Sequence, residues 1–126
     1  MRLVLVAVGG AIGSVFRYTL DGVVYRWLPA TFPYGTFIVN VIGCGVFGLV
    51  FGVGEQRLLV GSPARTFLLI GVLGGFTTFS TFAFESVQLL RAGQWWLAGV
   101  NVVGQVVLGF AALWIGFTLG RVLQGT

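Results

Sequence analysis

An uncharged segment, residues 66–84, carries at its centre the run Gly74-Gly75-Phe76-Thr77-Thr78-Phe79-Ser80-Thr81-Phe82. The segment is as long as a membrane-spanning helix, which needs roughly 17–25 residues. Paired glycines can loosen a helix and free its backbone carbonyls, and we predict that this helix is broken at Gly74-Gly75. The hydroxyls and phenyl rings that follow either line a path for a small polar solute or pack against neighbouring helices.

The rest of the chain has the same apolar character. It has 126 residues, of which 57% are hydrophobic and 8% charged, and its mean hydropathy is +1.02. A soluble surface normally carries about 25% or more charged residues, so lipid is the expected solvent. Residues 27–54 and 92–120 also carry no charge, and a further apolar segment runs from Leu3 to about Leu28. We expect that segment to stay in the protein as a helix, because no small-x-small cleavage site follows it.

These segments predict an all-α membrane protein with four transmembrane helices in a single domain, residues 1–126. The expected helices cover residues 3–28, 33–54, 65–90 and 95–122 approximately, joined by short connections. Because the spans use almost the whole chain, the sequence leaves no room for a separate soluble domain.

The ionisable residues exclude several classes of function. The net charge is +4 without any lysine, and the arginines are scattered near the predicted helix ends, which is typical of interfacial anchors and not of a nucleic-acid surface. The absence of histidine and the single Cys44 argue against a transition-metal site and an intrachain disulfide. No nucleophile triad, carboxylate pair or phosphate-binding loop is present, so we expect no enzymatic activity.

Glycine spacing and arginine placement bear on assembly. Pairs at i and i+4 let helix backbones approach closely, and they are Gly9/Gly13, Gly48/Gly52, Gly71/Gly75 and Gly116/Gly120. Four short helices enclose little interior, so these faces and the membrane-depth polar residues predict a partner copy of the chain. With the N-terminus inside, four arginines lie inside (Arg2, Arg57, Arg65 and Arg121) and two outside (Arg26 and Arg91). This weak bias permits insertion in both orientations, and it equally permits one fixed orientation.

Uncharged polar and aromatic residues are the candidates for an ion pathway. Asn40 lies inside the second predicted helix, where its amide either donates to an anion or makes a structural hydrogen bond. Phe79 and Phe82 share a helix face, with Thr78, Ser80 and Thr81 beside them. Because the edge of a phenyl ring is positive, rings aimed at a lumen favour an anion without a fixed charge that would trap it.

The charged residues of the predicted helices can each be interpreted in two ways. Arg17 and Asp21 form either a local i,i+4 salt bridge or, with Arg17 at a pore mouth, a site that concentrates anions. Glu85 is placed near the end of the third helix, as a solvated or arginine-paired carboxylate or as a proton-coupling group. On the fourth helix, Asn101 and Gln105 form a second polar stripe, which we expect to face the same polar region between the helices as Asn40 and the Thr77–Thr81 hydroxyls.

Three motifs, in this order along the chain, resemble the small fluoride channels of the Fluc (CrcB) family. They are Gly9-Gly10-x-x-Gly13-x-x-x-Arg17-Tyr18, the run Gly35-Thr36-Phe37-Ile38-Val39-Asn40-Val41-Ile42-Gly43, and the Gly74–Phe82 run quoted above. The resemblance covers nearly the full chain. It implies an antiparallel dimer of four-helix subunits in the inner (plasma) membrane, with two pores through which fluoride leaves the cell passively.

The resemblance also implies roles for single residues. Phe79 and Phe82 match the pore-lining phenylalanines, and Asn40 matches the asparagine of the ion path. Ser80 and Thr81 match the neighbouring hydroxyls, and Arg17 the vestibule arginine. Gly74 and Thr77 match the positions whose backbone carbonyls, from both subunits, hold a buried structural Na⁺.

This chain departs from the family in the fourth helix. Family members usually have a tyrosine and, four residues later, a serine, where this chain has Asn101 and Gln105. Amides still donate to anions, but the change leaves open a subunit that is non-conducting or works only in a heterodimer with a homologous partner. A proton-coupled exporter of the small multidrug type is the other alternative, and Glu85 is its candidate carboxylate.

Overall fold

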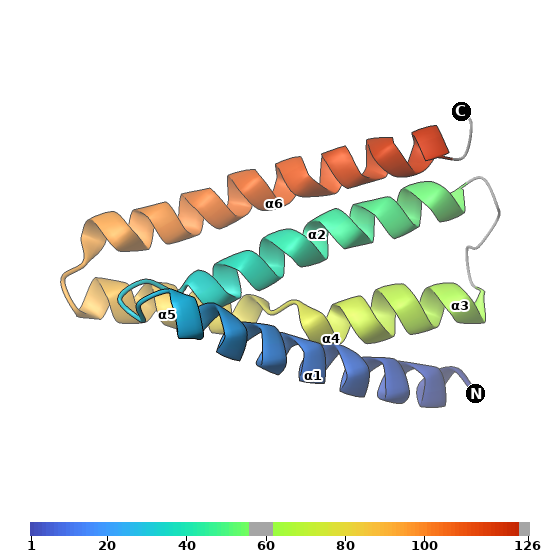
Figure 1. The fold of residues 1–126 in the computed structure, drawn as a ribbon, viewed down its shortest axis with the longest axis horizontal. Helices are drawn as coiled ribbons and strands as arrows, with labels where there is room; N and C mark the ends of the chain where they lie inside the picture. Colours follow the sequence, from blue (N-terminus) through green and yellow to red (C-terminus); the bar gives the residue numbers. More distant parts are fainter. Residues whose placement is uncertain (56–61, 124–126) are drawn as a thin grey trace.

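The computed structural model describes residues 1–55 and 62–123, and this part of the chain contains four helical spans long and apolar enough to cross a membrane (Figure 1). The first is α1 (Arg2–Trp27) and the second is α2 (Tyr34–Glu55). The third runs from Pro63 to Arg91 in several pieces, and the fourth is α6 (Trp95–Leu123). For residues 1–55 and 62–123, the prediction of a helical protein with four helices long and apolar enough to cross a membrane is therefore confirmed.

The third span is assembled from four helical pieces. It begins with α3 (Pro63–Arg65), whose N-cap Ser62 accepts a hydrogen bond from the Arg65 N–H at 3.1 Å. It continues as the wider π-helix η1 (Thr66–Leu73) and the short α4 (Gly74–Phe76). After an interruption, α5 (Phe79–Arg91) completes the span, with the Thr78 hydroxyl as its N-cap.

The interruption lies at Thr77 and Thr78, three residues beyond the predicted position. Gly74 is helical (φ −63°, ψ −38°), whereas Thr77 (φ −85°, ψ 158°) and Thr78 (φ −151°, ψ 118°) are extended. The prediction of a break at Gly74-Gly75 is thus wrong in position. The interruption lies at this point because of a side chain on another helix. The Thr78 N–H would continue the series of backbone hydrogen bonds of the helix, but it donates to Asn40 Oδ1 instead.

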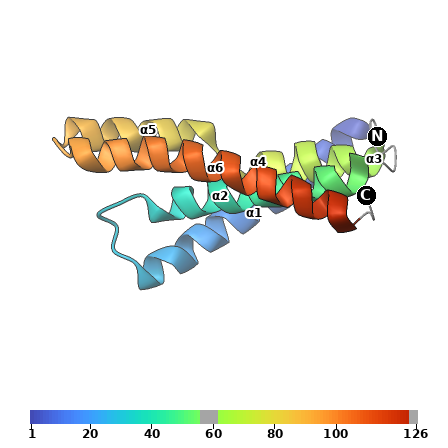
Figure 2. The same ribbon diagram turned by 90° about the horizontal axis from the view of Figure 1, so that it is seen from above.

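The helices pack as two pairs, α1 against the first half of the third span and α2 against α6 (Figures 1 and 2). Both contacts are so close that a Cβ atom has no room. On Gly9 it would lie 2.7 Å from the Phe67 carbonyl oxygen, and on Gly120 it would lie 2.6 Å from the Leu49 carbonyl oxygen. All four glycine pairs named above make close contacts inside the chain, so they do not by themselves indicate a partner copy, which stays a prediction.

The connections place the two described ends of the chain together. The turns between α1 and α2 and between α5 and α6 lie at one end of the bundle, and Arg2 and Leu123 lie at the other (Figure 1). The second turn uses Gly93 in the left-handed region (φ 76°), which favours glycine. Arg57 lies outside the described residues, so the predicted four-to-two arginine count is only partly represented in the structure.

Candidate functional site

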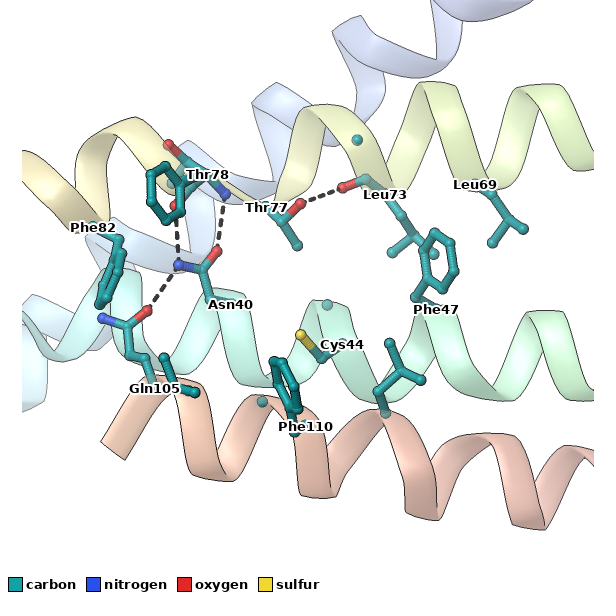
Figure 3. A pocket seen from close by; sticks show the side chains of 16 residues that line it. Asn40, Cys44, Phe47, Leu69, Leu73, Thr77, Thr78, Phe82, Gln105 and Phe110 are labelled. Carbon is teal, nitrogen blue, oxygen red and sulfur yellow. Dashed lines mark hydrogen bonds between the residues drawn. The ribbon is translucent and has the colours of Figure 1, made fainter. Parts of the chain in front are cut away.

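A cavity of about 450 Å³ opens beside the interruption, between α2, the third span and α6 (Figure 3). One end is polar, and the remainder is lined by apolar side chains and glycines. The polar and aromatic residues on its wall are Asn40, Phe47, Thr77, Thr78, Phe79, Phe82, Gln105 and Phe110. The structure thus brings together residues from three predicted helices. Arg17, Ser80, Thr81 and Asn101 do not line this cavity.

Asn40 joins α2 to the interruption in the third span. Its Oδ1 accepts the Thr78 N–H at 2.9 Å, and its Nδ2 donates to the Thr78 carbonyl oxygen at 3.0 Å. The second Nδ2 proton goes to Gln105 Oε1 at 2.9 Å. The side chain therefore replaces the backbone acceptor that the Thr78 N–H loses where the helix stops, and both of its N–H donors are occupied.

The polar stripe on α6 continues this network behind the cavity wall. Gln105 Nε2 donates to Asn101 Oδ1 at 2.7 Å, and Asn101 Nδ2 donates to Ser86 Oγ at 2.9 Å. The Ser86 hydroxyl donates in turn to the Phe82 carbonyl oxygen at 2.8 Å. Asn101 is 0% exposed, so its polar groups have only these protein partners.

Phe79 and Phe82 present two rings at the polar end of the cavity. Their centroids are 5.7 Å apart and their planes are tilted by 54°, so the rings meet edge toward face. Phe82 is half-buried above Gln105 (Figure 3), whereas the Phe79 side chain is 78% exposed. Phe79 therefore lies on an uncovered side of the cavity.

The hydroxyls of the run are divided between structure and cavity. The Thr78 Oγ1 accepts the Thr81 N–H at 3.2 Å and contacts the Thr81 hydroxyl at 3.0 Å, which starts α5. The Thr77 hydroxyl donates to the Leu73 carbonyl oxygen at 3.0 Å. Ser80 is exposed. Only Thr77 and Thr78 of these residues reach the cavity wall.

Arg17 lies on α1 beside the interruption. Its Nε donates to the Gly75 carbonyl oxygen at 3.4 Å and not to Asp21, so the salt-bridge interpretation is not supported. Gly75 is one of the last residues of α4, where four carbonyls lose their helical partners. Arg17 thus satisfies one backbone group next to the cavity without entering it.

The interruption leaves two more carbonyls available, those of Gly74 and Thr77. In a continuous helix each would accept the N–H four residues later. The Thr78 N–H, however, donates to Asn40, and the Thr81 N–H donates to the Thr78 hydroxyl. Carbonyl oxygens are the ligands that hard cations prefer, so this pair suits an alkali cation and not a transition metal.

Glu85 is not where the sequence placed it. It lies near the middle of α5, six residues before Arg91, which corresponds to roughly 9 Å along the helix. Its carboxylate interacts with the neighbouring Thr36 side chain, and Oε1 is buried with no hydrogen-bond partner among the described residues. The expectation of a solvated or arginine-paired carboxylate at a helix end is therefore wrong. Glu85 does not line the cavity.

The sequence interpretation missed Ser86 and Thr36, two buried hydroxyls that partner the predicted polar residues. A usable signal existed, because a buried amide or carboxylate needs partners of the opposite hydrogen-bonding type. Asn101 required an acceptor for its N–H groups, and Glu85 required a donor.

The chain has clear relatives among known proteins. A family model described as "CrcB-like protein, Camphor Resistance (CrcB)" matches residues 4–117. A protein from Nitratidesulfovibrio vulgaris strain Miyazaki F, named "Fluoride-specific ion channel FluC", is 49% identical over 122 residues, which cover 97% of this chain and 98% of that protein. Proteins of the same name from Maridesulfovibrio salexigens and Nitrosococcus oceani are 47% and 43% identical, each over 97% of this chain and over 97% and 98% of their own lengths.

Proposed function

Because this chain belongs to the CrcB-like protein family, we propose that it is a channel through which fluoride leaves the cell passively. The observation that carries the proposal is the lining of the cavity. None of the described residues on its wall is an aspartate, glutamate, lysine or arginine. Amide, hydroxyl and ring-edge groups replace part of the hydration of a small, hard anion, and without a fixed positive charge the ion is released quickly.

The cavity suits a channel better than a proton-coupled exporter. An exporter of that type needs a carboxylate in contact with the transported substrate. Glu85 is the only glutamate or aspartate on the second half of the third span, and it lies outside the cavity wall. The described residues thus provide an uncharged path and no coupling group on it.

We further propose that two copies assemble with opposite orientations, as an antiparallel homodimer in the plasma membrane. Asn40, Thr78 and Gln105 line a cavity whose outer ring, Phe79, is 78% exposed. Polar groups at membrane depth do not face lipid, so a second protein surface is the appropriate cover. A heterodimer with a homologous subunit would cover the same face, and it is the alternative if the chain alone does not conduct.

In such a dimer, the free carbonyls of Gly74 and Thr77 are the proposed ligands of a structural Na⁺. Gly74 is exposed in the single subunit, which leaves its carbonyl accessible to a partner. Two carbonyls from each subunit would supply four hard oxygen ligands and satisfy backbone groups that lipid cannot. The cation's charge would also hold the two interruptions together.

The direct test is ion release from liposomes that contain only this chain. We expect fluoride to leave much faster than chloride, with no requirement for a proton gradient. Chloride release at the fluoride rate would overturn the selectivity. Absent fluoride release from a correctly folded dimer would overturn the homomeric channel, and recovery on adding a homologous subunit would identify the heterodimer.

A further inference from the structure

Hydrogen bonds connect the interruption to the middle of α5 through two other helices. We call this set the amide series, and its members are Thr78, Asn40, Gln105, Asn101, Ser86 and Phe82. Each member donates to the next in one direction, from the Thr78 N–H to the Phe82 carbonyl. The series therefore starts and ends on the third span, having passed through α2 and α6.

The direction of the series is fixed by the backbone of Thr78. Its N–H can only donate, so the Asn40 atom that faces it must be Oδ1, and its carbonyl can only accept, so Nδ2 must face that oxygen. Nδ2 then requires the oxygen of Gln105, which places the Gln105 nitrogen against Asn101. By the same logic the Asn101 oxygen faces Gln105 and its nitrogen faces Ser86.

Ser86 anchors the far end of the series. Its hydroxyl proton goes to the Phe82 carbonyl, so in this arrangement its oxygen accepts the N–H of Asn101. If the Asn101 amide turned over while Ser86 kept its bond to Phe82, two acceptors would face each other at Ser86 and two donors would face each other at Gln105. Ser86 therefore supports, from the far end, the orientation of the Gln105 amide that Thr78 sets from the near end.

This orientation matters to the cavity because of the donors that remain. Asn40 has none, since both of its N–H groups are engaged. Gln105 lines the cavity and uses only one N–H in hydrogen bonds among the described residues, so its second N–H is available at the wall. A reversed Gln105 amide would put its oxygen there and release Asn40 from one of its bonds.

We propose that Ser86 and Asn101 are positioning residues for the ion path, which fix Gln105 as a donor at the cavity wall and Asn40 as the clamp on Thr78. Neither residue lines the cavity, and Ser86 is 6% and Asn101 0% exposed. The effect on conduction rests on the proposed fluoride channel. The effect on the amides does not, and it can be measured separately.

The separate measurement uses the asparagine side chains. Asn40 and Asn101 are the only asparagines in the sequence, so a dimer labelled with ¹⁵N in this residue type gives one pair of side-chain amide signals from each position. Asn101→Leu assigns them by removing one pair. We expect Ser86→Ala to shift the signals of both asparagines, although Ser86 contacts only Asn101, and we expect Ser86→Thr to restore the wild-type positions of the signals.

Thr118→Val is the matched control. Like Ser86, Thr118 donates its hydroxyl to the carbonyl four residues earlier, that of Trp114, at 2.9 Å, but no amide donates to it. We expect this variant to leave both asparagine signals and the fluoride flux unchanged. Ser86→Ala leaves the Asn101 N–H that faces Ser86 without an acceptor. The free-energy cost of one such unsatisfied buried group corresponds to a factor of about ten, so we expect flux per folded dimer to fall by roughly tenfold. Adding Ser86→Ala to Asn101→Leu should have little further effect, because Ser86 acts only through Asn101.

The outcomes separate the two proposals. Wild-type Asn40 signals in Ser86→Ala, or wild-type flux and selectivity in that variant, would overturn the positioning role. Additive losses in the double variant would assign Ser86 to packing and also overturn it. A wild-type chain that conducts no fluoride would refute the channel and leave the amide shifts standing. If Ser86→Ala forms no dimer, Ser86→Cys replaces it, because a thiol keeps the size but accepts weakly.

Discussion

Asn40→Leu should destabilise the folded chain, because it removes all the partners that hold the interruption in place. Leucine has the branched shape and the heavy-atom count of asparagine, although its methyl groups are bulkier, so the change deletes three hydrogen bonds without leaving a cavity. The groups left without a partner are the Thr78 N–H and Gln105 Oε1, because the Thr78 carbonyl, as the N-cap of α5, keeps its intrahelical bond. Leucine itself gains little, because lipid is as apolar as its side chain.

The expected loss follows from the three hydrogen bonds and from the two groups left without a partner. An average side-chain hydrogen bond in a membrane protein contributes about 0.6 kcal/mol, which gives about 2 kcal/mol for three bonds. Asn40 and Thr78 are half-buried, so the penalty for each orphaned group lies near the low end of the range for buried groups, about 1 kcal/mol, which gives about 2 kcal/mol for two groups. By either route the free energy of unfolding should fall by about 2 kcal/mol.

Equilibrium unfolding in mixed micelles, followed by tryptophan fluorescence, measures this difference. Thr118→Val again serves as the control, since it removes one hydroxyl from an exposed site and should change the free energy of unfolding by less than about 0.5 kcal/mol. An Asn40→Leu variant that is as stable as this control would refute the reasoning that the Asn40 amide determines where the third span is interrupted.

The remaining predictions concern conduction and assembly. Phe79→Ile and Phe82→Ile should each lower fluoride flux by about fivefold to tenfold while the dimer persists, because a ring-edge contact worth about 1 kcal/mol is lost. Wild-type flux of these variants in liposomes would show that the two rings only pack against their neighbours. Glu85→Gln should conduct fluoride at a rate close to wild type, and abolished transport would support the proton-coupled exporter. Replacing Na⁺ with a large organic cation should weaken the dimer in size-exclusion chromatography, whereas an unchanged profile would argue against the structural cation. A cysteine introduced next to Arg2 should react with impermeant reagents from both faces of native membranes, and reaction from one face only would eliminate the antiparallel homodimer.

Charge gaps predicted the spans well because the cost of placing charges in lipid is a local property of the sequence. The interruption was placed wrongly for the opposite reason. Gly74-Gly75 has the local propensity for a break, yet both glycines stay helical, and the backbone leaves the helix at Thr78 because Asn40, 38 residues earlier, takes its N–H. No pattern within the third segment contains that information.

The glycine pairs show the same limit of local reasoning. Their spacing indicated close helix contacts correctly, but spacing does not say whether the second helix belongs to the same chain. The structure uses Gly9 against the Phe67 backbone and Gly120 against the Leu49 backbone, both within one subunit. Likewise, Asn101 and Gln105 stood out as a polar stripe, but their roles depend on Ser86, whose importance appears only when the hydrogen-bond donors and acceptors are matched.

The position of the described chain ends at one end of the bundle has a consequence for protein engineering. The start of α1 and the end of α6 lie at the same end of the bundle. In two copies with opposite orientations, the end of α6 in the first copy and the start of α1 in the second copy therefore lie on opposite sides of the bilayer. A soluble linker could not join them in a genetic fusion. A single-chain version of the proposed dimer would need an additional membrane-crossing helix as its linker, whereas a fusion without one would force both copies into the same orientation.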